Sequence, residues 1–230
     1  MNKYIKTTLS IALLFSASSH ASFQQVSVYS DGDQMATLDK STGIEWLDTN
    51  LTKGESFTSL SSRLGESGDL YGWRLPTKDE VFTMLDNYFG ATYQGVFDTG
   101  ESVTDSTDVN FSSSKYAYTA LHFINTFGQE ELKTPSNTDY NYKQMRIRFK
   151  GSSGNAEYLS VYHSGYKVYT GGNPIKDVSI RTYEQNDPKG TYANRSHGYF
   201  LVSDGGVTLD SINNPNLNEN NPNSPYNVPV

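Results

Sequence analysis

Hydrophobic and polar residues alternate in two short runs near the start of the chain, Met35–Asp39 and Ile44–Asp48. A turn-forming cluster, Lys-Ser-Thr-Gly at 40–43, separates them. Alternation on both sides of such a cluster is typical of a β-hairpin. The period of two predicts that Ile44 and Trp46 share one face of the second strand.

Two helices are predicted after the hairpin. The first spans Ser56–Gly65, where a serine can cap the first turn and apolar residues recur at helical spacing. The second begins at Thr77–Glu80, a capping box in which the Thr hydroxyl accepts the N3 amide and the Glu side chain reaches back. An apolar stripe follows, and Gly90 is expected to end this helix.

Longer loops and a meander make up the rest of the pattern. Residues 91–115 are rich in Gly, Ser, Thr and Asp and indicate a surface insertion, whereas Tyr116–Phe127 is apolar and fits either a strand or a short helix. Later alternation predicts an antiparallel meander with one solvent-exposed face. The expected strands are Gln144–Lys150, 158–162, Tyr166–Thr170, Asp177–Tyr183 and Gly198–Val202.

The first 21 residues have the organisation of a secretory signal. Two lysines precede a short apolar run, and small residues at −3 and −1 predict cleavage between Ala21 and Ser22. A membrane anchor or a buried helix is the alternative, but the run is far shorter than the roughly 20 residues that a bilayer span needs. We therefore expect a secreted, periplasmic or cell-surface protein with no transmembrane segment in the mature chain.

The last 20 residues differ sharply in composition from what precedes them. Asn and Pro dominate 211–230, and so few apolar residues predict a disordered tail. The expected organisation is a signal peptide over 1–21, one α+β domain over 22–210, and this tail.

Composition excludes several classes of chemistry. The 230 residues carry a net charge of −7 and no cysteine. Disulfides, Cys-ligated zinc, thiol nucleophiles and iron–sulfur clusters are therefore excluded. The acidic balance argues against a nucleic-acid partner, because phosphate backbones require clustered Lys and Arg.

Three segments carry a resemblance to known families: Gly-Ile-Glu-Trp-Leu-Asp at 43–48, Gly-Trp-Arg-Leu-Pro-Thr-Lys-Asp-Glu at 72–80, and Gly-Tyr-Phe-Leu-Val at 198–202. Their order resembles the Lcl C-terminal domain family of bacterial surface proteins. The second segment is also similar to sulfatase-modifying proteins, and the first looks like a group of exported PEP-CTERM-associated proteins.

The resemblance implies a C-type lectin-like α+β fold: an antiparallel sheet, two helices, paired first and last strands, and long loops. It also implies a glycan or protein ligand at the cell surface, with adhesion or biofilm roles. The sequence lacks the cysteines of the copper-dependent sulfatase-modifying enzymes. It also lacks the carboxylate-bearing triplets of calcium-dependent lectins, to which Asn173 in Gly-Asn-Pro-Ile comes nearest.

Tyrosines offer the strongest candidate for ligand binding. On the exposed face of a sheet they would form a rigid platform for stacking on sugar rings or protein surfaces. Cross-strand aromatic pairs that stabilise the sheet are the alternative. The candidates are Tyr158, Tyr162, Tyr166 and Tyr169.

Acidic loops suggest a calcium site, since Ca²⁺ takes six to eight oxygen ligands. Solvated acidic loops are the alternative, and neither cluster has the EF-hand spacing. Otherwise no cofactor is expected. The candidate metal ligands are Asp31, Asp33, Asp98, Asp105 and Asp108.

Catalytic motifs are absent from the sequence. The histidines at 122, 163 and 197 lack zinc-binding spacing, and there is no nucleophile elbow or phosphate-binding loop.

Trp73 is expected in the core, and Arg74 is expected to pair with a carboxylate or a carbonyl, the alternative being a ligand-facing arginine. The sequence thus favours a non-enzymatic binding protein for a glycan, matrix polymer or protein. A self-associating matrix component and an enzyme with a distributed carboxylate/His site are the alternatives.

Overall fold

The structure is a computed structural model that describes residues 22–89, 114–128, 131–133, 142–150, 156–164, 178–185, 191, 193 and 197–227. Its first sheet, in the order β1-β2-β3-β9, consists of β1 (Phe23–Val26), β2 (Ala36–Asp39), β3 (Ile44–Leu47) and β9 (Val202–Ser203). The second sheet consists of β4 (Glu131–Lys133), β5 (Tyr142–Lys150), β6 (Ala156–Ser164) and β7 (Val178–Gln185), with β8 (Gly198–Tyr199) beside β5.

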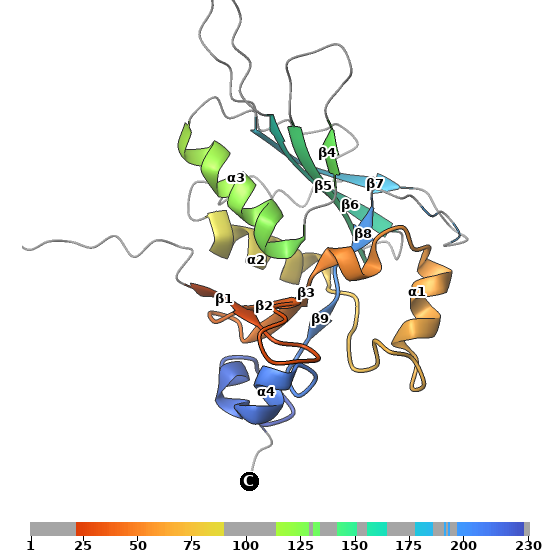
Figure 1. Ribbon diagram of the computed structural model, residues 1–230, viewed down its shortest axis with the longest axis vertical. Helices are drawn as coiled ribbons and strands as arrows, with labels where there is room; N and C mark the ends of the chain where they lie inside the picture. The colour runs from red at the N-terminus through yellow and green to blue at the C-terminus, as the bar shows by residue number, and fades with distance from the viewer. Residues whose placement is uncertain are drawn as a thin grey trace, which may run out of the picture.

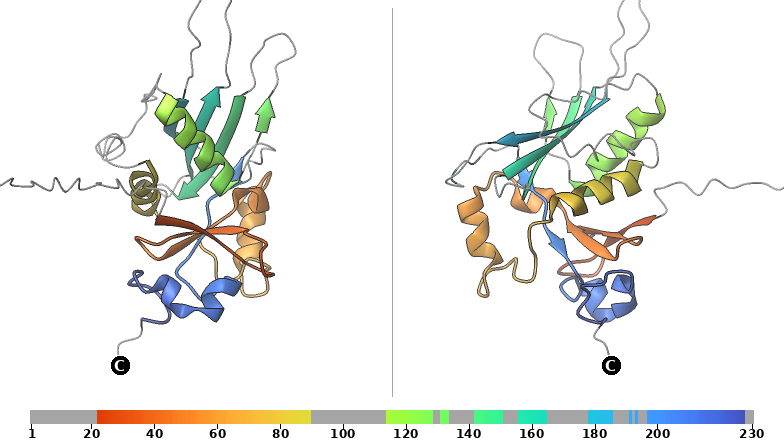
Figure 2. Two further views of the ribbon diagram at one scale, coloured as in Figure 1. Left: turned by 60° about the vertical axis from the view of Figure 1, so that its left-hand side comes forward. Right: turned by 180° about the vertical axis from the view of Figure 1, so that it is seen from behind.

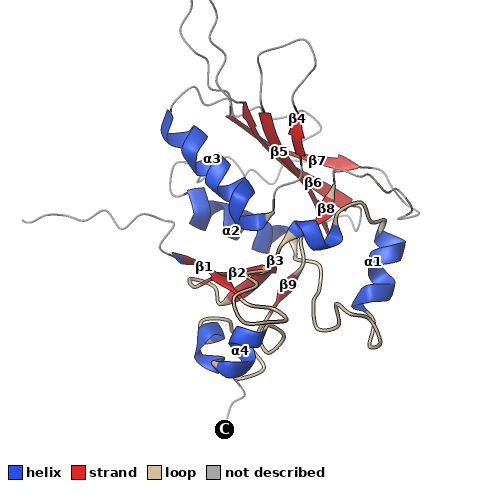
Figure 3. Cartoon of the chain, in the orientation of Figure 1, coloured by secondary structure: helices blue, strands red, loops and turns tan. Residues whose placement is uncertain are grey.

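The described helices lie around these sheets. They are η2 (Thr49–Thr52), α1 (Phe57–Leu64), α2 (Lys78–Phe89), α3 (Ser114–Phe127), α4 (Leu209–Asn213) and η3 (Pro215–Asn218). Figures 1 and 2 place α2 and α3 between the two sheets, whereas α4 lies on the opposite side of the first sheet. Figure 3 shows this mixture of helices and largely antiparallel strands, which confirms the α+β class. Within the described residues, no helix is long and apolar enough to cross a membrane.

The predicted hairpin forms as β2 and β3. Thr37 lies opposite Trp46 in antiparallel register. The turn closes when the Gly43 amide donates to the Asp39 carbonyl at 2.7 Å. Gly43 has φ +69°, and a Cβ at this position would lie 2.7 Å from the backbone nitrogen of Asn221, so both conformation and space require glycine.

The late strand joins the two sheets. Val202 pairs with Trp46 on β3, and Gly198 pairs in parallel with Ile147 on β5. The expectation that the hairpin lies beside Gly198–Val202 is therefore confirmed. The pairing uses the second hairpin strand, and β1 lies at the sheet edge rather than next to the last strand.

Both predicted helices are present with their predicted caps. The Ser56 hydroxyl accepts the Ser59 amide at 3.1 Å. At α2, the Glu80 amide donates to the Thr77 hydroxyl at 3.2 Å, and the Thr77 amide donates to the Glu80 carboxylate at 2.7 Å. The capping box is thus reciprocal, as its sequence predicts.

The apolar segment after the insertion is a helix, α3. Four of its residues at helical spacing are at most 1% exposed, namely Ala120, Phe123, Ile124 and Phe127. They pack with α2, the second sheet and Trp46 in the larger hydrophobic cluster. A second cluster, on the other face of the first sheet, contains Leu47, Leu60 and Trp73.

The described meander strands β5, β6 and β7 are antiparallel, as predicted, whereas the predicted strand Tyr166–Thr170 lies outside the described residues. The polar face of the meander is not exposed where its side chains are described. Arg148 and Tyr158 are each 1% exposed, and Ser160 is 5% exposed. Arg148 donates to the Tyr199 hydroxyl at 2.9 Å and to the Glu55 carbonyl at 3.5 Å. Strand β8 and the segment leading into α1 therefore cover this face, which period-two alternation alone could not reveal.

The C-terminal prediction of disorder over 211–230 is wrong for residues 211–227. Asn218 and Asn221 are at most 1% exposed. The Asn218 amide donates to the Gly43 carbonyl at 2.8 Å, and the Asn221 amide donates to the Asp204 carboxylate at 2.9 Å. Side-chain amides bonded to the backbone of the fold thus order a segment that has little apolar surface to bury.

Candidate functional site

The predicted tyrosine platform does not form at Tyr158. Its ring is buried and lies 5.1 Å from the His197 ring at a steep angle, with the Arg148 guanidinium 5.2 Å from its centroid. Tyr158 is therefore part of the core, and its prediction as a ligand-binding residue is wrong. Tyr162 lies on β6, but its side chain is outside the described set. Tyr166, Tyr169 and Asn173 lie outside the described residues.

The buried side chains around Tyr158 also determine the protonation state of His197. Arg148 lies 3.3 Å from Nδ1 of His197, and Arg146 lies 3.4 Å from its Nε2. Burial, reinforced by these two guanidinium groups, lowers the pKa of His197 to about 4. The imidazole is therefore neutral at physiological pH.

Asp33, a predicted metal ligand, closes a loop instead. Both of its carboxylate oxygens accept backbone amide protons at 2.8–3.1 Å, from Val28, Tyr29, Ser30 and Met35. Burial opposes ionisation of this carboxyl, but these bonds outweigh it and lower its pKa.

Other predicted metal ligands have no metal-binding arrangement in the described residues. Asp31 is exposed on the same turn as Asp33. No cluster of three His, Asp or Glu side chains suited to a metal occurs among the residues that the structure describes. Asp98, Asp105 and Asp108 lie outside those residues, as does Ala21 of the predicted cleavage site, whereas Ser22 directly precedes β1.

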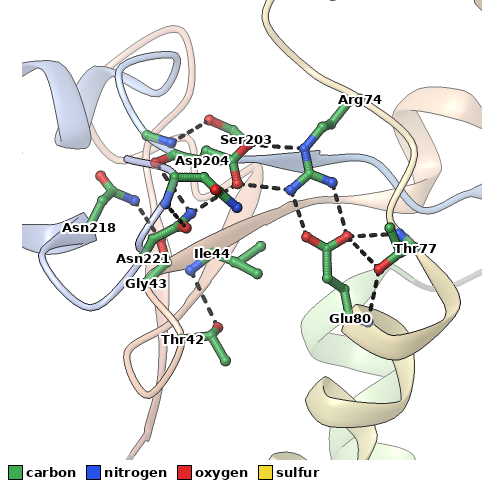
Figure 4. Close-up of polar contacts among 12 residues, drawn as sticks. Thr42, Gly43, Ile44, Arg74, Thr77, Glu80, Ser203, Asp204, Asn218 and Asn221 are labelled. Atoms are coloured by element: carbon green, nitrogen blue, oxygen red, sulfur yellow. Dashed lines mark hydrogen bonds and ion pairs between the residues drawn. The ribbon is translucent and has the colours of Figure 1, made fainter. Parts of the chain in front are cut away.

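Arg74 has the structural role that the sequence favoured. Its guanidinium donates to both oxygens of Glu80, at 2.9 and 2.6 Å, and to both oxygens of Asp204, at 3.0 and 2.8 Å. Figure 4 shows Arg74 between these carboxylates, with Thr77 and Asn221 completing the network. Although burial acts in the opposite direction, Arg74 and the other donors lower the pKa of both carboxyls. This network joins the start of α2 to the segment after β9.

An open groove along β1 is the candidate ligand site. Its volume is about 590 Å³, within the usual range for small-molecule sites. Residues from β1, the 33–34 turn, β2, the end of β3, α2 and α3 line it. They are Phe23, Gln24, Gln25, Asp33, Gln34, Thr37, Asp48, Tyr88, His122, Asn125 and Thr126.

The floor of the groove is aromatic and fixed by packing. Tyr88 is fully buried, and its ring centroid lies 4.8 Å from that of Phe23. Its hydroxyl bonds to Nδ1 of His122 and lies 3.1 Å from the Thr126 hydroxyl. Burial raises the pKa of Tyr88 well above its usual value, so this hydroxyl stays protonated. Tyr88 itself has no exposed surface, so the groups of the floor that face the groove are the partly buried Phe23 ring and the side chains of His122 and Thr126.

The wall of the groove connects the sheet to α3. The Gln25 amide donates to the Thr37 hydroxyl at 2.8 Å and to the Thr126 carbonyl at 3.1 Å. The Thr37 hydroxyl donates to the same carbonyl at 3.2 Å. These bonds satisfy a carbonyl at the end of α3, where intrahelical partners run out, and hold the two sides of the groove at a fixed separation.

The mouth of the groove contains a strained residue. Gln34 has φ +52°, and it is the one non-glycine residue with positive φ among the residues that the structure describes. Its side chain is exposed at the groove. A residue other than glycine in this region costs on the order of 1 kcal/mol, and such strain is concentrated at functional sites. On the same side, burial raises the pKa of Asp48 despite its bonds to Asn50.

Sequence reasoning missed this groove because its residues come from distant parts of the chain. One signal was available: His122, Asn125 and Thr126 share one face of a helix, but only if 116–127 is read as a helix. Scans of protein-family models, curated proteins and solved structures each found no match to this chain. The groove is therefore interpreted from its own geometry.

Proposed function

We propose that this chain is an exported, non-enzymatic protein that binds a neutral saccharide in the groove along β1. The observation that carries the proposal is the chemistry of the lining. It combines the partly exposed Phe23 ring with side-chain amides, hydroxyls and two carboxylates, and the described residues that line it include neither Lys nor Arg.

Each of these groups suits a sugar. Sugar hydroxyls donate and accept hydrogen bonds, so they pair with amides, which also do both, and with the Asp48 carboxylate, which accepts. The Asp33 oxygens already accept backbone amides, so this carboxylate contributes charge rather than a free acceptor. The C–H faces of a pyranose are apolar and stack on aromatic rings such as Phe23. An acidic glycan would instead meet Asp33 and Asp48 with neither Lys nor Arg in the described lining to offset them.

The proposed cellular setting and fold subclass follow from the sequence resemblance. The leader over 1–21 supports export to the periplasm, the surface or the medium, where adhesion or biofilm formation would use a glycan-binding protein. The pairing of β9 with the hairpin, together with α1 and α2, is compatible with a C-type lectin-like fold, and we include that subclass in the proposal.

An enzymatic role is the second candidate, because His122 and Asp48 line the same groove. The geometry favours it less. The Nδ1 of His122 is bonded to the Tyr88 hydroxyl, and Asp33, the second carboxylate that a pair of acids would need, has both oxygens occupied by backbone amides. Release of reducing ends from a bound saccharide, abolished by His122→Ala, would establish the enzyme reading over simple binding.

The proposal is tested with a glycan array and two matched variants. We expect neutral glycans to bind the wild-type mature protein. Asn125→Ala removes an exposed amide in the groove and should weaken binding about two- to tenfold, as loss of one hydrogen bond does. Asn216→Ala removes an exposed amide from the C-terminal segment and should leave binding unchanged. Absence of any neutral glycan ligand, or equal loss in both variants, would refute the proposal.

A further inference from the structure

Two tyrosines outside the groove are unusually exposed. Tyr29 is 56% exposed and Tyr71 is 61% exposed, the highest values among the large hydrophobic residues that the structure describes. Exposed aromatic rings on ordered loops are common ligand contacts, because they offer a large rigid surface at little cost in conformational entropy. Their positions relative to the groove therefore matter.

Tyr29 lies directly beside the groove. Its backbone amide donates to Oδ2 of Asp33 at 2.8 Å, and Asp33 is one of the lining residues. The same loop is held at a second point, because the Gly32 amide donates to the Ser27 hydroxyl at 3.0 Å. The backbone that carries the Tyr29 ring is thus fixed by the carboxylate at the groove mouth.

Tyr71 lies on an equally well-anchored loop. Arg63 donates two hydrogen bonds to Asp69, at 2.9 and 2.8 Å. Leu70 is fully buried and Trp73 is 4% exposed, so the exposed Tyr71 sits between two core residues. The two loops are neighbours, because the 207–209 segment contacts both of them. The Val207 side chain lies against Gly72, next to Tyr71, and the Leu209 amide donates to the carbonyl of Val28, next to Tyr29, at 3.1 Å.

The groove leads toward these rings. It follows the first three residues of β1, Phe23–Gln25, a length of about 10 Å at 3.3 Å per residue. Phe23 and Tyr88 lie at one end, and Asp33 and Gln34 lie where β2 begins, at the other. A linear ligand that leaves the groove past Gln34 therefore reaches the loop that presents Tyr29.

We propose that the ligand is an extended oligosaccharide, whose chain continues from the groove past Gln34 onto a second subsite formed by the rings of Tyr29 and Tyr71. This inference rests on the proposed function and goes beyond it, since it specifies a polymer rather than a single sugar. Aromatic rings that are more than half exposed on anchored loops suit the stacking of successive pyranose units, and the phenolic hydroxyls supply polar edges.

The test compares chain lengths with neutral probes. The probes are β-1,4-linked oligomers of glucose and of N-acetylglucosamine with two, four and six units, measured by isothermal titration calorimetry with the mature protein. We expect the six-unit oligomer of the better-bound series to bind at least about tenfold more tightly than the two-unit one. Tyr29→Ala should weaken binding of the longer oligomer about fivefold, the loss typical of one aromatic contact, and leave the two-unit affinity unchanged.

Conservative variants separate stacking from folding. Tyr29→Phe keeps the ring and should retain the preference for the longer oligomer, and Tyr71→Ala should reduce it as Tyr29→Ala does. Equal affinity for two and six units, or equal loss of both in Tyr29→Ala, would overturn the second subsite while leaving the groove proposal intact. Failure of both oligomer series to bind would overturn this inference, whereas the proposed function would be refuted only by the outcomes given for the glycan array and its two variants.

Discussion

Replacing Arg74 by methionine tests the network that joins α2 to the segment after β9. The substitution keeps most of the aliphatic stem but removes four hydrogen bonds to two carboxylates, Glu80 and Asp204. It also leaves those carboxylates close together without a cation between them. We therefore expect a loss of stability rather than a change in the groove.

The magnitude follows from the exposure of the three side chains. They are 36% exposed at Arg74, 18% at Glu80 and 25% at Asp204. Exposed ion pairs contribute at most about 1 kcal/mol, whereas breaking a buried pair costs about 3–5 kcal/mol. This half-buried, doubly paired arginine lies between those limits, and we expect Arg74→Met to lower the free energy of unfolding by about 2–3 kcal/mol.

The pH dependence gives a sharper signature than the magnitude. The pKa values of Glu80 and Asp204 are lowered in the folded protein, so their contribution is present above the unfolded values near 4 and is lost as the pH falls through the folded ones. Urea unfolding at pH 7, 5 and 3 should therefore show a similar difference between wild type and Arg74→Met at pH 7 and 5, and a smaller one at pH 3.

A matched control is available in the same chain. Arg63 also contacts two carboxylates, Glu55 and Asp69, but Asp69 is 63% exposed. The Arg63–Glu55 pair is half-buried like the pairs of Arg74, at 28% and 16% exposed, so only one of the two Arg63 pairs is a surface pair. Arg63→Met should therefore cost about 1–2 kcal/mol, less than Arg74→Met. A loss below 0.5 kcal/mol for Arg74→Met, as for a typical surface substitution, or a loss that stays constant down to pH 3, would refute the reasoning.

Three further predictions concern single residues. Because the pKa of His197 is lowered from 6.5 to about 4, the unfolded chain binds a proton that the native chain does not, and stability should fall by up to about 3 kcal/mol as the pH drops through that range. His197→Asn should remove this dependence in urea titrations, and an unchanged pH profile would contradict it. Gln34→Gly should raise stability by up to about 1 kcal/mol by relieving positive φ, while weakening saccharide binding; thermal unfolding that shows destabilisation would count against strain at this position. Asn221→Ala should cost about 1–3 kcal/mol, since it leaves the Asp204 carboxylate and carbonyl without an amide partner; an unaltered denaturation midpoint would show that the C-terminal segment is not held in this way.

Local signals in the sequence predicted the local structure well. The hairpin at 36–47, the serine cap of α1 and the Thr77–Glu80 capping box depend on residues within a few positions of one another, and each forms as expected. The role of Arg74 was also predictable, because a structural helix entry directly follows it. Its second partner, Asp204, is 130 residues away and could not be identified from spacing.

Features that depend on distant contacts could not be predicted. Alternation predicted that Tyr158 faces away from the core, but not that β8 and the 49–56 segment cover that face. Low hydrophobicity predicted a disordered C-terminus, because composition does not show that Asn218 and Asn221 would find partners at Gly43 and Asp204. The groove could not be predicted for the same reason, since strand, turn and helix residues from distant parts of the chain meet there only after folding.

The most direct measurement for the central claim is a two-dimensional ¹H–¹⁵N NMR titration of the mature protein with neutral oligosaccharides. Side-chain amide signals of Gln24, Gln34 and Asn125 report on the groove, and that of Asn216 reports on the C-terminal segment. Saccharide binding in the groove should shift the first three signals and leave the fourth in place. Shifts confined to residues outside the groove, with all three groove amides unmoved at saturation, would contradict the account.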